Sequence, residues 1–222
     1  MALIDFFTQP NSFGSVGNVN IIMPANTDTN LLGNTIASVI GSYHNVGIST
    51  PPHSVFIMPA EYSSQNERPF STFQPATVFL FPYANPAELI FQYLHELCHH
   101  IVGSFLPDKF WIAELLCSTS ALWFFPGQQY PDYGNNLSAR FFLNYATNKA
   151  NYQYIKATLP ANPSNVYLAQ THIGSALLAY WYENKNFNFV ELLRQYALAK
   201  DNPSKQEPLN NYVISILEGT AK

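Results

Sequence analysis

His95, Glu96 and His99 form a His-Glu-x-x-His pattern, the arrangement in this sequence best suited to chemistry. On an α-helix, residues four positions apart share a face, so both imidazoles can bind one metal ion. Glu96 lies one step round the helix, where its carboxylate can accept a proton from a water molecule at that ion. The alternative is that these polar residues form the solvated face of an ordinary helix.

The surrounding residues predict that this pattern lies on a helix. An Asn-Pro-x-Glu stretch beginning at Asn85 places a cap, a first-turn proline and a capping-box glutamate in order, and Gly103 favours a left-handed stop. When the residues of this helix are placed at about 100° steps, the apolar side chains fill an arc of roughly 220°. The motif residues lie on the remaining polar arc, together with Glu88 and Gln92. His100 turns toward the apolar arc, so we expect it to support the site or the core.

A second carboxylate, Glu114, follows in an apolar segment. Residues 110–125, FWIAELLCSTSALWFF, predict a helix that is apolar nearly all round, with Glu114 as its one charged residue. A buried carboxylate without a cation is costly, and no basic residue lies three or four positions away. A metal held by the two histidines would satisfy it and complete a common catalytic zinc set. The alternative is an ion pair with a lysine or arginine elsewhere in the chain.

Other positions are weaker candidates for the third ligand. Phe105 occupies the position, six residues after the motif, where a histidine would complete a different zinc motif. Asp108 is better explained as a cap at the turn between the helices, and Asp132 has no supporting motif around it. We therefore predict one zinc ion per chain, bound by the two motif histidines and Glu114.

The overall composition bears on partners and location. The chain has 222 residues, of which 47% are hydrophobic and 11% charged, and its net charge is −4 without any lysine or arginine run. We therefore expect no binding to nucleic acid. We also expect a monomer, although no particular residue pattern specifies the oligomeric state. No apolar run is long enough for a bilayer, and the N-terminus lacks the basic start of a secretory signal. We expect no membrane association. We expect the protein to lie in the cytosol or to be exported by a specialised secretion system into a host cytosol. Cys98 and Cys117 are expected to be buried thiols rather than a disulfide.

Hydrophobic patterning predicts an α+β chain in which a small sheet precedes a mainly helical part. Residues 61–74 are polar and predict a loop, whereas 76–82 predict a strong strand ended by proline. We expect Thr77–Phe81 to be an edge strand to which a peptide substrate adds as a further strand. The other expected elements are strands at 19–24 and 53–60 and helices at 27–47, 137–150, 164–184, 187–200 and 208–218.

Three segments resemble the gluzincin metallopeptidases. HELCH at 95–99 is similar to their zinc-binding helix, WIAELLC at 111–117 to the segment with the ligand glutamate, and ATVFLF at 76–81 to the strand before that helix. The resemblance implies a zinc-dependent endopeptidase in which Glu96 is the general base. The motif position, low charge and missing signal also resemble secreted bacterial effector proteases of this type, which implies host actin as the protein substrate.

The same resemblance implies a zincin-like fold with a small mixed sheet, a zinc-binding helix and a helical lobe. A single metallopeptidase domain would span 1–222, with an upper lobe of about 1–103 and a lower lobe of about 104–222.

Catalysis would also require a hydrogen-bond donor to the oxyanion. Tyr180, His172 and Tyr167 are candidates, and we predict His172 and Tyr167, against the alternative that each is a core residue. Three other functions stay open: a zinc hydrolase acting on an ester or small amide, a catalytically inactive zincin-fold binding module, and a metal-free partner module. Intact Glu96 argues against an inactive module, because a structural zinc site needs no base.

Overall fold

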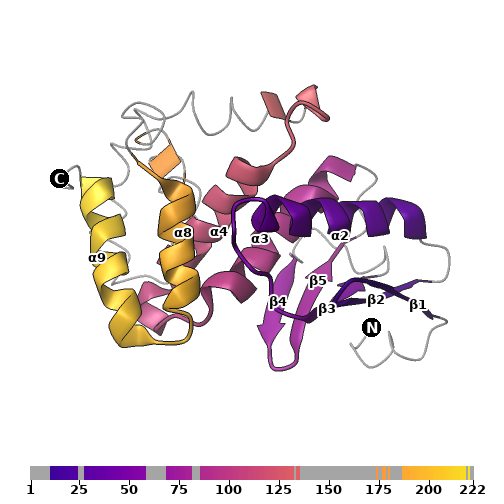
Figure 1. The fold of residues 1–222 in the computed structure, drawn as a ribbon, viewed down its shortest axis with the longest axis horizontal. Coiled ribbons are helices and arrows are strands. Elements are labelled where there is room, and N and C mark those ends of the chain that lie inside the picture. Colours follow the sequence, from indigo (N-terminus) through magenta and orange to yellow (C-terminus); the bar gives the residue numbers. More distant parts are fainter. Residues whose placement is uncertain are drawn as a thin grey trace. The chain divides into compact units, whose positions relative to one another are not determined.

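The computed structural model describes residues 11–24, 28–58, 69–81, 86–132, 134–135, 174, 177–178, 180, 187–218 and 220. The chain groups into two compact units, Met1–His100 and Ile101–Lys222. The architecture is α+β, as expected: the first unit holds a five-stranded mixed sheet with helices, and the described part of the second is helical (Figure 1). The expectation of a single metallopeptidase domain with two lobes stays a prediction.

The sheet consists of β1 (Asn11–Val16), β2 (Val19–Pro24), β3 (His53–Ile57), β4 (Phe70–Phe73) and β5 (Ala76–Leu80). Their order across the sheet is β1-β2-β3-β5-β4. The three inner strands are parallel to one another, whereas β1 and β4 run antiparallel to their neighbours. The strands expected at 19–24, 53–60 and 76–82 are confirmed, while β1, with its glycine and serines, was not predicted.

β5 is an interior strand, so the prediction that Thr77–Phe81 forms a sheet edge is wrong. It pairs with β3 on one side and with β4 on the other. β4 itself lies in the segment 61–74, which was expected to be a loop. Its four residues are too short a run to be distinguished from a loop by pattern, and they become a strand by folding back on β5 through Gln74 and Pro75.

α2 (Thr29–His44) confirms the helix expected at 27–47. Asp28 caps its start, because the carboxylate oxygen Oδ1 accepts hydrogen bonds from two first-turn amides at 3.0 Å each. Gly47 follows its end with a φ of 74°, a left-handed conformation that suits glycine. Figure 1 shows α2 running along the sheet.

α3 (Pro86–Val102) carries the His-Glu-x-x-His pattern and ends where expected, at Gly103 with a φ of 78°. Within the first unit it contacts α2, since the Tyr43 hydroxyl donates to the Leu94 carbonyl at 2.8 Å. The fully buried side chains of this unit include Ile36, Tyr43, Val55, Leu80, Leu94 and Leu97. The motif helix is therefore part of the core of the first unit.

The described helices of the second unit are η2 (Pro107–Lys109), α4 (Phe110–Phe124), α8 (Phe189–Leu198) and α9 (Pro203–Glu218). α4 and α8 confirm the helices expected at 110–125 and 187–200. α9 begins earlier than the expected 208, because the Asn202 side chain accepts from the Lys205 amide at 3.2 Å and caps a helix that starts with Pro203. Pro208 therefore lies inside the helix, near its start.

Two further expectations concern the described residues alone. None of their helices is both long and apolar enough to span a membrane. Cys98 and Cys117 are buried and form no disulfide, as expected. The helix expected at 137–150 lies outside the described residues, and four residues of the one expected at 164–184 are described and helical: Gly174, Leu177, Leu178 and Tyr180.

Candidate metal centre

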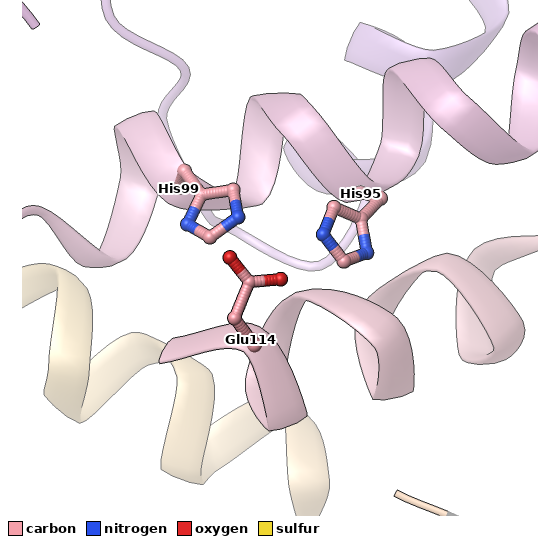
Figure 2. A group of neighbouring side chains, drawn as sticks. All are labelled: His95, His99 and Glu114. Carbon is pink, nitrogen blue, oxygen red and sulfur yellow. The ribbon is translucent and has the colours of Figure 1, made fainter. Parts of the chain in front are cut away.

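The three side chains predicted as metal ligands lie together in the structure. His95 and His99 come from α3 and Glu114 from α4, and one ligand atom of each lies within 4.8 Å of the other two. Figure 2 shows both imidazole rings facing the carboxylate of Glu114. His99 is buried, whereas His95 and Glu114 are half-buried, so the group keeps access to solvent.

The donor set and its spacing fit a zinc ion. Two imidazole nitrogens and one carboxylate oxygen are the protein ligands of many catalytic zinc sites. Ligand atoms around a tetrahedral zinc ion lie roughly 3.4 Å apart, so a separation of 4.8 Å would have to close by at most about 1.4 Å. The two rings stand 5.2 Å apart between centroids and at 66° to each other. Among the described residues, this is the group of three histidine, cysteine or acidic side chains that could hold a metal.

The face of α3 that carries the motif is largely buried. Glu96 and His99 are each 6% exposed and Gln92 is 9% exposed. The alternative that this stripe is the solvated face of an ordinary helix is therefore wrong. Polar groups removed from water in this way need polar or charged partners, and a metal centre is one source of them.

The weaker candidates for the third ligand lie elsewhere. Asp108 forms an ion pair with Lys109 at 2.8 Å, and the hydrogen bond from Lys109 lowers the pKa of the Asp108 carboxyl. Asp108 lies within η2, whose cap position is Leu106, so the expectation that it caps the turn is wrong: its carboxylate binds the adjacent ammonium instead. Asp132 is exposed and is not part of the metal-ligand group.

A buried cluster, called the sheet anchor below, connects α3 with the sheet through His53, Tyr93 and His100. Nδ1 of His53 donates to the Pro51 carbonyl at 2.8 Å, because a carbonyl only accepts. Nε2 of His53 therefore accepts from the Tyr93 hydroxyl at 2.6 Å. Burial lowers the pKa of His53, although the Pro51 carbonyl opposes this, and burial raises the pKa of Tyr93. Both groups are thus neutral at physiological pH.

His100 completes the sheet anchor. Its ring stacks on that of His53 with centroids 5.8 Å apart, and its Nε2 donates to the carbonyl of Thr77 in β5 over 3.4 Å. The expectation that this histidine turns toward the apolar arc is confirmed, since it is buried on the sheet side of α3. His53 and Tyr93 were not predicted, because neither a histidine at the start of a strand nor a tyrosine in an apolar arc indicates its partner.

A second set of contacts, called the linker clasp below, holds the segment between α3 and α4. Asp201 accepts from the Ser104 amide at 2.8 Å and from its hydroxyl at 2.9 Å. Nε2 of the buried Gln206 donates to the carbonyls of Val102 and Ser104 at 3.3 and 3.1 Å. The turn between α8 and α9 and the first turn of α9 thus satisfy the end of the motif helix, which no local pattern could have indicated.

Phe105 has a packing role in the same segment. Its ring stacks on that of Tyr196 in α8, with centroids 5.6 Å apart. The Tyr196 hydroxyl in turn donates to Asn210 of α9 at 2.8 Å. The position that would hold a further histidine in another zinc motif therefore supports the linker instead.

The predicted oxyanion donors are not placed by the structure. His172 and Tyr167 lie outside the described residues. Tyr180 is described, helical and half-buried.

Chemically, the arrangement offers two imidazoles and a carboxylate for a divalent cation, with the buried Glu96 carboxylate in the position next to His95. That combination can bind a metal and take part in proton transfer beside it. No protein-family model matches this chain, and no curated protein matches its sequence.

Proposed function

We propose that this chain is a zinc-dependent endopeptidase of the gluzincin type, with a zincin-like fold. The observation that carries the proposal is the approach of His95, His99 and Glu114 to within 4.8 Å, with the buried Glu96 next to His95. A purely structural site has no need of that extra carboxylate. The mixed sheet ahead of α3 and the helices after it support the proposed fold.

In the proposed mechanism, His95, His99 and Glu114 would hold the zinc ion. Zinc, when bound, polarises a carbonyl group and lowers the pKa of a water molecule toward neutrality. Glu96 accepts a proton from the attacking water and delivers it to the leaving amine. Its burial supports this role, since a carboxylate shielded from bulk water acts on the nearby groups with less screening. His172 and Tyr167 stay the predicted donors to the oxyanion.

We place the binding of an extended peptide at the outer edge of β4. Among the described strands, β4 is the last on the side of β5, so its outer main-chain groups can pair with a further strand. Phe70 and Phe73 of this strand are 38% and 40% exposed and offer apolar contacts to substrate side chains. Main-chain pairing would hold the substrate extended, and these rings would add selectivity for apolar residues.

The test compares wild-type protein with Glu96→Gln, Glu88→Gln, His95→Ala and Glu114→Ala. Zinc per chain is measured by elemental analysis. Each zinc-treated protein is then incubated with purified actin, which the effector resemblance makes the first substrate to try, and with a cell lysate. New N-termini are identified by mass spectrometry.

The expected result is one zinc per wild-type chain and cleavage of a protein substrate. Glu96→Gln keeps the zinc and loses several orders of magnitude in rate, because only the base is removed. Glu88→Gln is the matched control: it makes the same chemical change on the same helix, two turns earlier, and leaves activity unchanged. His95→Ala loses most of the metal, and Glu114→Ala binds it more weakly.

Each deviation identifies a different error. Full zinc affinity in Glu114→Ala means that the third ligand is another residue, and strong residual activity in Glu96→Gln means that another base operates. If actin stays intact while lysate proteins are cut, the assignment of actin as the substrate is wrong and the peptidase function still stands. Zinc binding with hydrolysis of esters alone indicates a non-peptidase hydrolase, zinc binding without hydrolysis indicates an inactive binding module, and absence of zinc indicates a metal-free module.

A further inference from the structure

Gln92 carries an unusual polar group on the motif face of α3. The side chain is 9% exposed, and its Oε1 accepts a hydrogen bond from the Phe81 amide, 3.4 Å away. Because an amide N–H only donates, the side-chain oxygen must face it, and this determines the orientation of the carboxamide. Nε2 is then turned away, buried, and without a hydrogen-bond partner among the described residues.

Buried donors without a partner are rare in folded proteins, because each loses its hydrogen bonds to water and gains none in return. A methionine or leucine at this position would fill similar space without that cost. The need to accept from Phe81 explains the oxygen of the carboxamide but not the amino group. The Nε2 donor therefore requires a separate explanation.

The position of Gln92 relates it to the metal centre. It precedes His95 by three residues and Glu96 by four, so it lies on the same stripe, about one turn nearer the start of α3. A group bound at His95 and extending along the helix toward its N-terminus would pass this donor. All of these residues belong to α3.

We propose that Gln92 is a substrate-binding residue whose Nε2 donates a hydrogen bond to a main-chain carbonyl of the peptide held at the metal centre. The proposal rests on the proposed peptidase function and narrows it. The donor is uncharged and lies one turn from Glu96, so a neutral amide carbonyl suits it better than a carboxylate, which Glu96 would repel. Gln92 thus selects an internal segment of a chain over a terminal carboxylate, in agreement with endopeptidase action.

The test uses metal-binding probes, so that it does not depend on turnover. Acetohydroxamate supplies the chelating group alone. Two peptidyl hydroxamates carry an Ala-Ala extension, one on the amino side of the chelating group and one on the carboxyl side. Binding to zinc-loaded protein is measured by calorimetry for wild type, Gln92→Met and Gln92→Glu. Gln92→Glu keeps an acceptor for the Phe81 amide and replaces the amide donor with a carboxyl group, and the comparison with acetohydroxamate corrects for any effect of its charge on the bound zinc. Gln195→Met, on an exposed glutamine of α8, is the matched control.

The measured quantity is the affinity for each peptidyl probe divided by that for acetohydroxamate. For at least one peptidyl probe, we expect this ratio to fall roughly tenfold in both Gln92 variants and to stay unchanged in Gln195→Met. An unchanged ratio in folded, zinc-loaded Gln92 variants overturns the proposal, because the amide then serves the fold or an ordered water only. Loss of folding or of zinc in both variants overturns it as well, since the group is then structural.

Failure of the underlying function is recognised separately. If acetohydroxamate does not bind zinc-treated wild-type protein, the metal centre itself is wrong and the role of Gln92 falls with it. If acetohydroxamate binds and the peptidyl ratio does not respond to Gln92, only the role of Gln92 is wrong.

Discussion

The sheet anchor and the linker clasp both hold α3, but they use different groups in different surroundings. In the sheet anchor, His53, Tyr93 and His100 are all buried and interact through uncharged hydrogen bonds and ring stacking. In the linker clasp, the exposed carboxylate of Asp201 holds Ser104. Gln206 and Val102 are buried there, whereas Ser104 is exposed.

The difference indicates which contact α3 depends on more. When a buried hydrogen bond loses one partner, the other is left without water to replace it, whereas exposed groups recover hydrogen bonds from solvent. The sheet anchor includes Tyr93 and His100, which stand two residues before His95 and directly after His99. We therefore expect damage to the sheet anchor to disturb folding most and to reach the metal ligands on α3.

The largest effect is expected for His53→Ala, which tests whether the buried anchor is the stronger one. The substitution leaves a cavity and removes the acceptor of the buried Tyr93 hydroxyl, so the free energy of unfolding should fall by about 2–4 kcal/mol. Urea denaturation measures it. His44→Ala is the control, because His44 is exposed and the hydrogen bond between its ring and the Thr50 hydroxyl, at 3.2 Å, can be replaced by water. Equal losses in the two variants would mean that the sheet anchor is not the stronger contact.

A smaller loss is expected for Gly103→Ala, which tests how tightly the linker clasp is packed. Gly103 has a φ of 78°, and an added Cβ would lie 2.6 Å from Cγ of Lys200 and 2.7 Å from Oδ1 of Asp201. Gly17 is the matched control, since its φ is 56° but an added Cβ would meet nothing within 4 Å. Both variants incur backbone strain of about 1 kcal/mol, and Gly103→Ala should lose about 1–2 kcal/mol more. Equal melting temperatures for the two variants would show that Lys200 and Asp201 can move away from the added Cβ at little cost in stability.

The smallest changes in the free energy of unfolding are expected from changes in pH. The sheet anchor and the linker clasp should respond in different pH ranges. Burial lowers the pKa of His53, so the unfolded chain takes up a proton at this residue more readily than the folded one. Stabilisation from neutral His53 is complete above about pH 6.5 and is lost as the pH falls from there toward its lowered pKa. For Asp201, burial acts to raise the pKa, but the hydrogen bonds from Ser104 and the charge of Lys200 outweigh it and lower the pKa. Its stabilisation is therefore present above about pH 4 and is lost below it.

The two pH ranges can be measured in one series. Urea denaturation of the chelator-treated protein at several pH values excludes metal release as a cause. His53→Gln should flatten the dependence on pH below about 6.5, and Asp201→Asn should flatten it below about 4. If His53→Gln follows the wild-type curve in parallel throughout, His53 does not titrate differently in the folded and unfolded chains.

Local patterns were enough to predict the helices that carry the candidate ligands. The glycine stop at Gly103 and the apolar run around Glu114 each depend on residues within a few positions of one another. A helix forms its hydrogen bonds between residues four apart, so its limits and its faces are encoded locally. The shared face of His95 and His99, and the choice of Glu114 over Asp108 as their neighbour, followed from that local order.

Tertiary structure decided the features that depend on residues far apart in the chain. Whether β5 is an edge or an interior strand depends on the pairing of β3 and β4 with it, which strand propensity does not specify. His53 meets Tyr93 across 40 positions, and Asp201 meets Ser104 across 97. In both pairs each side chain is an ordinary polar residue in its own segment, and it acquires a partner only when separate elements are brought together in the folded chain.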